Sequence, residues 1–173
     1  MKHSMKLAFL FLAGMGGMAF AQKAFKGEAP PQNFHLGAMA GIGVIDSRVG
    51  ASFQGTAAVK VMNRGFVDDI NNQLFVEAAF GPLLLTGSTV FQYSFHLRWD
   101  FIKDMDWSFY ALGGFGGMIS GTDYSPLPPA PGRSVSYFYP RFGVGAMWGL
   151  FELVSLRVEL SHEFIGLGAV VLL

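Results

Sequence analysis

Ionisable residues of both signs recur at every second position along several segments of this chain, and they are the residues best placed to do chemistry. The clearest segment, VFQYSFHLRWDF from Val90 to Phe101, alternates His96, Arg98 and Asp100 with apolar side chains. Side chains two residues apart lie on the same face of a strand, so these three would share one side of a sheet. The same alternation across the chain predicts an inward set of Lys60, Glu77, His96, Arg98, Asp100, Arg141, Arg157 and Glu159.

These inward charges can be interpreted in two ways. An ionised group in a narrow interior is stable only when it is paired and hydrogen-bonded, which favours an interlocked network of salt bridges that plugs the interior. The alternative is a selective channel lined by the same charges. His96 with Glu77 or Asp100 could also form an acid and base pair, but we interpret these contacts as structural.

A second candidate for chemistry is the sequence Ser161-His162-Glu163. Some small membrane barrels modify lipid A with a serine, a histidine and an acid at the barrel rim, which makes a lipid-modifying enzyme an alternative. Adjacent residues on a strand point to opposite faces, however, so His162 is poorly placed to activate Ser161. We therefore predict no catalytic site.

No metal or cofactor is predicted. The chain has no cysteine, which removes disulfides, thiolate ligands and a lipid-bearing cysteine. His35, His96 and His162 fall in separate segments without the short spacing typical of a metal site.

The elements that must position these residues are segments of about ten residues in which apolar side chains alternate with small or polar ones. In the segment Gln73 to Leu83, Phe75 departs from the pattern. Eight candidate strands result: Phe34 to Ile45, Ala51 to Met62, Gln73 to Leu83, Val90 to Phe101, Trp107 to Ile119, Ser136 to Trp148, Val154 to His162 and Ile165 to Leu173.

The composition indicates apolar solvent outside the fold. Of 173 residues, 51% are hydrophobic, 15% are aromatic and only 14% are charged, yet no uninterrupted apolar run of helix-spanning length follows the N-terminal region. In lipid every backbone polar group must be paired internally, which leaves the closed barrel. We predict an all-β, eight-stranded antiparallel up-and-down transmembrane β-barrel. The alternative, a soluble β-sandwich, should present a polar outer face, whereas the second face here is aromatic.

The N-terminus predicts export. Lys2 and Lys6 precede the apolar stretch Leu7 to Met18 and the small-x-small sequence Ala19-Phe20-Ala21, typical of a cleaved secretory signal peptide over residues 1–21. The alternative is an N-terminal membrane anchor, for which the stretch is short. A periplasmic segment (22–33) and the barrel (34–173) would follow. The formal net charge of +0 and the absence of a basic stripe exclude a nucleic-acid partner.

Two further features bear on the membrane. Trp99, Phe101, Trp107 and Trp148 flank the predicted turns at one end, as expected for an interfacial aromatic girdle. The Pro-rich stretch Gly121 to Ser134, GTDYSPLPPAPGRS, cannot continue a strand and should form an external loop available for contacts.

The chain resembles the small outer-membrane barrels of the OmpA transmembrane-domain and OmpX type, through the AFAQ ending of the signal, segments such as FQYSFHLRWDF and SLRVELSHEF, and termination on a strand. The resemblance implies a Gram-negative outer membrane, lipid contact, and a C-terminal signal read by the barrel assembly machinery. Gly168, Val171 and Leu173 match that signal, although the family commonly ends on an aromatic residue.

Together these features predict a cell-envelope protein with a structural or surface-interaction role, no enzymatic activity, and a lumen plugged by inward salt bridges. The alternative is a small porin-like pore or a transporter of small or apolar solutes.

Overall fold

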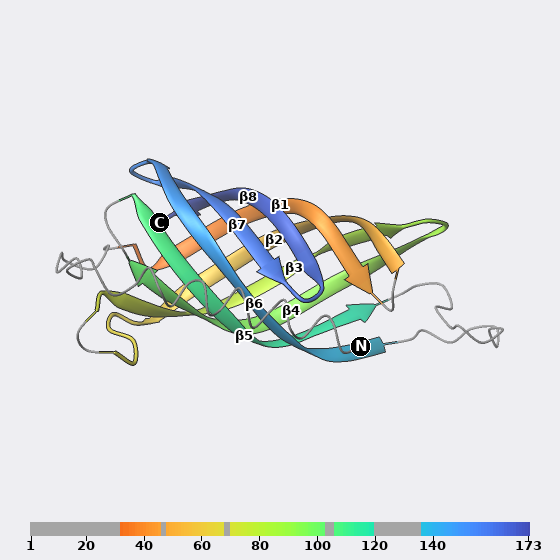
Figure 1. Cartoon of the computed structure of the whole chain (residues 1–173), viewed down its shortest axis with the longest axis horizontal. Helices are drawn as coiled ribbons and strands as arrows, with labels where there is room; N and C mark the ends of the chain where they lie inside the picture. The colour runs from red at the N-terminus through yellow and green to blue at the C-terminus, as the bar shows by residue number, and fades with distance from the viewer. Residues whose placement is uncertain (1–31, 46–47, 68–69, 103–105, 120–135) are drawn as a thin grey trace, which may run out of the picture.

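The computed structural model describes residues 32–45, 48–67, 70–102, 106–119 and 136–173. These residues form eight strands that pair in sequence order and close into a barrel, with the strands running obliquely around it (Figure 1). The strands are β1 (Phe34–Ile45), β2 (Arg48–Met62), β3 (Asn72–Leu85), β4 (Ser88–Ile102), β5 (Trp107–Ile119), β6 (Ser136–Phe151), β7 (Val154–Ser161) and β8 (Phe164–Leu172). The described part of the chain contains no helix long and apolar enough to cross a membrane.

Every neighbouring pair is antiparallel, and β8 pairs with β1 to close the barrel. This confirms the predicted up-and-down architecture and rules out the β-sandwich. The predicted limits of β1 and β5 match the structure, whereas several other strands are longer than predicted. The longer ladders arise because pairing continues to the turn: β3 and β4 pair as far as Leu85 and Ser88, around Gly87 with a φ of 80°.

The two faces of the sheet carry opposite chemistry. Outward-pointing Phe95 and Leu167 are 63% and 67% exposed, whereas inward-pointing Glu77 and Arg98 are 1% and 0% exposed. A soluble protein would place these residues the other way round. An apolar exterior around a polar interior, with no open sheet edge, is the arrangement required of a transmembrane β-barrel.

Glycine on the inner face lets neighbouring strands approach closely. A Cβ atom at Gly81 would lie 1.8 Å from the carbonyl oxygen of Phe53, and one at Gly168 would lie 2.1 Å from that of Ala38. Both contacts join a strand to its neighbour, so glycine at these positions permits the tight curvature of an eight-stranded barrel.

The barrel has two distinct ends. The start of β1 and the end of β8 lie together, where Asn33 and Phe34 donate backbone hydrogen bonds to the carbonyl of Leu173. We call this the terminus end. The end of β1 and the start of β2 lie at the opposite end, called here the loop end, as do the corresponding ends of β3 and β4, β5 and β6, and β7 and β8.

Three predicted segments cannot be placed on this barrel. The signal peptide (1–21), the segment 22–33 apart from its last two residues, and the loop from Gly121 to Ser134 lie outside the described residues.

We expect Phe95→Arg to lower the free energy of unfolding by about 2–4 kcal/mol, because it places a cation on the lipid face near the middle of β4. Urea titration in phospholipid vesicles, followed by tryptophan fluorescence, measures the change. Thr86→Arg in the exposed β3–β4 turn is the matched control and should have little effect. Equal losses in both variants would contradict a membrane-facing position for Phe95.

Candidate functional site

Glu77 on β3 is the centre of an ionic network in the lumen. Arg157 on β7 donates from Nη2 to Oε1 at 2.7 Å and from Nη1 to Oε2 at 2.8 Å, a bidentate contact across the barrel. Arg98 on β4 also donates to Oε2, and His96 Nε2 lies 3.1 Å from Oε1. One carboxylate therefore joins one wall of the barrel to the opposite wall.

Arg98 uses each of its nitrogens. Nε and Nη2 donate to the two oxygens of Asp100 at 2.8 and 3.0 Å, Nη2 also donates to His35 Nδ1 at 2.8 Å, and Nη1 donates to Glu77. The guanidinium always keeps its protons, so His35 must accept through an unprotonated Nδ1. The guanidinium also lies 4.7 Å from the ring centroid of Phe75, a cation–π contact.

The cation–π contact with Arg98 explains why an aromatic residue stands at position 75. Phe75 occupies the inward register position between Gln73 and Glu77 and is fully buried, although its apolar ring broke the expected alternation. The inner face of β3 uses the ring as a platform for Arg98 and for Lys60, whose Nζ lies 5.9 Å from its centroid.

Arg157 and Glu159 extend the network along β7. Arg157 Nη2 donates to Glu159 Oε2 at 2.6 Å, and Arg157 Nε donates to the hydroxyl of Tyr110 at 2.9 Å. That hydroxyl has one proton to donate, and the carbonyl oxygen of Val158 and Glu159 Oε2 both lie within hydrogen-bonding distance of it. The Tyr110 ring also carries the Arg157 guanidinium 4.8 Å from its centroid, so β5 supports the charges that β7 supplies.

Arg141 on β6 carries the network toward the loop end. It donates to Glu159 Oε1 at 2.5 Å and to Ser94 Oγ at 2.6 Å. Its Nε lies 3.0 Å from Glu163, an ion pair without the geometry of a hydrogen bond. Ser94 is 3.4 Å from His96 Nδ1, so the contacts lead back to Glu77.

The structure places all of the predicted lumen charges except Lys60 in this buried network; Lys60 is half-buried at the terminus end. The predicted set held three carboxylates against four cations, with His96 left to adjust. Buried Glu163 supplies a fourth carboxylate, so the lumen groups comprise four carboxylates and four cations, with Lys60 included and His96 not counted.

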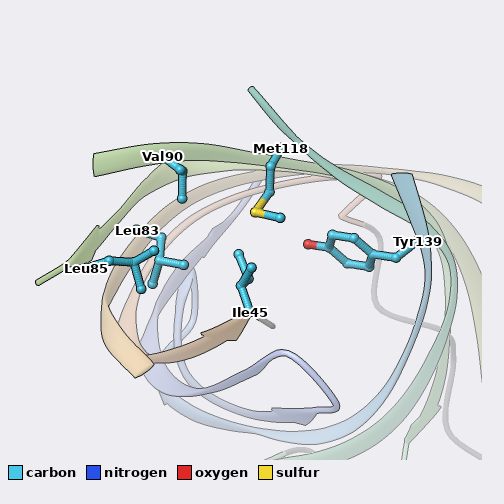
Figure 2. Close-up of a cluster of buried hydrophobic side chains, with 6 residues drawn as sticks. All are labelled: Ile45, Leu83, Leu85, Val90, Met118 and Tyr139. Atoms are coloured by element: carbon cyan, nitrogen blue, oxygen red, sulfur yellow. The ribbon is translucent and has the colours of Figure 1, made fainter. Parts of the chain in front are cut away.

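Buried apolar side chains line the lumen at the loop end. They point inward from five strands, as Figure 2 shows, and are at most 9% exposed: Ile45, Leu83, Leu85, Val90, Met118 and Tyr139. Neutral polar side chains lie between these apolar residues and the charged groups, and among them Ser52 donates a hydrogen bond to Gln92 at 3.0 Å. On β1, β3, β4, β5 and β6 apolar side chains therefore lie between the charged groups and the loop end, whereas on the β7–β8 side the ion pairs of Glu163 reach the turn.

The Ser161-His162-Glu163 sequence does not form a relay in this structure. The Ser161 hydroxyl donates to the carbonyl oxygen of Phe164 at 3.1 Å. His162 lies at the exposed turn with Nδ1 2.8 Å from Glu163, while Glu163 turns inward toward Arg141. The described residues also contain no group of His, Asp or Glu side chains that could hold a metal ion.

The predicted girdle residues all lie toward the terminus end. Trp99 and Phe101 on β4 have ring centroids 4.4 Å apart, and Trp107 stacks on its register partner Trp148 at 5.8 Å. Trp99 donates from its indole nitrogen to Asn72 at 2.8 Å, which satisfies its one polar group. Phe66, which the sequence reasoning did not single out, adds an edge contact to Trp99.

The three predicted assembly-signal residues lie at the closing seam. Gly168 is on the inner face of β8, whereas Val171 and Leu173 are exposed on the outside. Their recognition by the assembly machinery stays a prediction.

Several network members were missed from the sequence: His35, Phe75, Ser94, Tyr110 and Glu163. His35, Ser94 and Tyr110 already occupied the inward register, so a search for polar partners as well as charges would have found them. Glu163 follows Ser161 at the same two-residue spacing and would have appeared if the alternation had been continued into the turn.

No family model matches the chain, and no curated protein matches it. Among solved structures, two of Ail, the attachment invasion locus protein of Yersinia pestis, are similar. The one in complex with the heparin analogue sucrose octasulfate is 13% identical, covers 82% of this chain and 94% of its own, and has a TM-score of 0.47. The other is 12% identical, covers 82% and 95%, and has the same TM-score. The architecture of this chain rests on its own strand pairing.

We expect Glu77→Gln to lower the free energy of unfolding by about 3–5 kcal/mol, because it leaves the buried guanidiniums of Arg98 and Arg157 short of a negative partner. Unfolding by urea in vesicles measures the loss. Glu152→Gln, in the exposed β6–β7 turn, is the control of identical chemistry and should cost little.

A double variant separates charge pairing from packing. Adding Arg157→Met to Glu77→Gln removes one cation with the carboxylate, so the combined loss should be smaller than the sum of the two single losses, by about 0.5–3 kcal/mol. Strict additivity would mean that Glu77 and Arg157 do not interact as described.

Proposed function

We propose that this protein is an exported outer-membrane β-barrel of a Gram-negative bacterium with a structural or surface-interaction role, and that its lumen is plugged by the ionic network. The observation that carries the proposal is the contact of Glu77 with both Arg98 and Arg157, each at most 1% exposed, in the middle of the barrel. A functional pore would need that space for water.

The plug follows from size and charge together. An eight-stranded barrel has an interior only just wide enough for its own side chains. Here that interior holds three arginines and their carboxylates, and apolar side chains from β1, β3, β4, β5 and β6 line the loop end. A permeating ion would have to separate buried ion pairs and pass the apolar side chains at the loop end, both of which cost free energy.

Export and location rest on two supports. Residues 1–21 have the composition of a cleaved signal peptide, and barrels of this kind belong to outer membranes. The partners would be lipid along the apolar exterior and the barrel assembly machinery at Gly168, Val171 and Leu173.

A surface-interaction role is supported by the arrangement of the connections. The β5–β6 connection contains the Pro-rich stretch Gly121 to Ser134 and starts from the loop end, away from both barrel termini. With the termini in the periplasm, this stretch would face the outside of the cell, where it would make contacts. A catalytic role is not proposed, since the Ser161 hydroxyl is engaged by a backbone carbonyl.

We expect the refolded protein to give no stepwise conductance in planar lipid bilayers, because the lumen is filled. Heat-modifiable migration of the same preparation on a gel provides the folding control. The paired removal Glu77→Ala with Arg98→Ala, which deletes one anion and one cation, should raise conductance if it inserts as a barrel. Reproducible channel steps from the unaltered protein would instead support the pore.

Orientation is tested by cysteine labelling, which is clean because the chain has no native cysteine. We expect Ala130→Cys in the Pro-rich stretch to react with a membrane-impermeant maleimide on intact cells. Asn33→Cys, beside the start of β1, should react only after the outer membrane is permeabilised. The reverse pattern would place the Pro-rich stretch in the periplasm.

A further inference from the structure

The terminus end of the barrel presents apolar side chains on two separate connections. Near the β2–β3 connection, Met62, Phe66 and Val67 are 42%, 66% and 38% exposed. At the β6–β7 turn, Leu150, Phe151 and Leu153 are 40%, 74% and 50% exposed. We call these six residues the terminus collar. Exposed apolar groups of this size on a turn signal contact with something other than water.

Two β-bulges help to create the collar. The register between β2 and β3 shifts between Lys60 and Met62, and that between β6 and β7 shifts between Gly149 and Phe151. Strict alternation would turn Met62 and Phe151 toward the barrel axis, on the side of Lys60 and Gly149. Bulges re-aim side chains, and here each one turns an additional apolar side chain outward at the same end of the barrel.

The β2–β3 side of the collar is held in place by hydrogen bonds. Asn72, buried at 1% exposure, donates from Nδ2 to the carbonyl oxygens of Val67 and Ile70 at 2.6 and 2.8 Å. Its Oδ1 accepts from Trp99, and the Phe66 ring packs on the same indole. The exposure of Phe66 and Val67 therefore belongs to an ordered arrangement that is attached to the girdle.

The described turns at the loop end expose polar groups instead. The β3–β4 turn presents Thr86, Gly87 and Ser88, and Arg48 donates to the carbonyl oxygen of Thr86 and to the hydroxyl of Ser88. The β7–β8 turn presents His162. Of the turns that the structure describes, these two therefore offer polar groups to water, whereas the β2–β3 and β6–β7 connections expose apolar side chains.

We propose that the terminus collar lies within the headgroup layer of the adjacent leaflet and binds zwitterionic glycerophospholipid. The collar adjoins the aromatic girdle on both sides: the Phe66 ring packs against Trp99, and Leu150 and Phe151 follow Trp148 at the end of β6. Exposed Arg64 near Phe66 suits a lipid phosphate, and exposed Glu152 between Phe151 and Leu153 suits a lipid ammonium. Amphipathic side-chain sets of this kind are stable at the boundary between headgroups and acyl chains.

The test uses single cysteines carrying the polarity-sensitive fluorophore NBD, in protein refolded into phosphatidylcholine and phosphatidylethanolamine vesicles. Val67→Cys and Leu153→Cys report on the two sides of the collar, and Thr86→Cys at the loop end is the control. We expect blue-shifted emission at both collar positions, with strong quenching by phospholipids brominated near the headgroup end of the acyl chain. The control should emit as in water and be quenched little.

Emission as in water at both collar positions would overturn the proposal. A blue shift without bromolipid quenching would overturn it too, since it would mean that protein, such as a second copy of the chain, covers the collar. A further variant, Phe151→Ser, should lower the urea midpoint in vesicles more than Thr86→Ser does. None of these readouts depends on whether the lumen conducts, so failure here is distinct from failure of the plugged-lumen proposal.

Discussion

The pairing of buried charges across the lumen is the constraint on which the rest of the structure depends. A carboxylate or guanidinium removed from water is stable only with close, well-directed partners. Glu77 meets that requirement by accepting from arginines on β4 and β7, strands from opposite sides of the barrel. Strand register is thereby specified from the inside, because a slip of one residue would turn Arg98 or Arg157 to the lipid.

The lipid exterior imposes the complementary requirement. Side chains on the outer face need only be apolar, and alanine, aliphatic and aromatic residues are all found there. On the inner face, each side chain must match its partners in charge and size. Rings serve on both faces for different reasons. Phe95 and Phe142 are exposed on the outer face, while Phe75 and Tyr110 support guanidiniums in the interior. A residue's type alone therefore does not indicate its face.

The different requirements of the two faces explain how much of the fold could be predicted from the sequence. Alternation alone predicted eight strands and the limits of β1 and β5, because every second residue is fixed by the pleat. The same rule assigned Phe75 as an exception, since it reserved the inner face for small or polar side chains. It also gave no indication of the apolar cluster of Ile45, Leu83 and Val90, because inward apolar residues look like errors in an amphipathic pattern. The bulges near Met62 and Phe151 depend on local pairing, which composition does not encode.

The seam between β1 and β8 has a consequence for how the molecule is made. The first and last strands are neighbours, and Glu77 meets Arg157 across 80 residues of chain, so contact order is high and no half of the barrel completes its own hydrogen bonding. A chain missing either terminal strand would leave a row of unsatisfied amides facing hydrocarbon. Closure is therefore cooperative: the cylinder is sealed only when β8, the last strand of the barrel, pairs with β1.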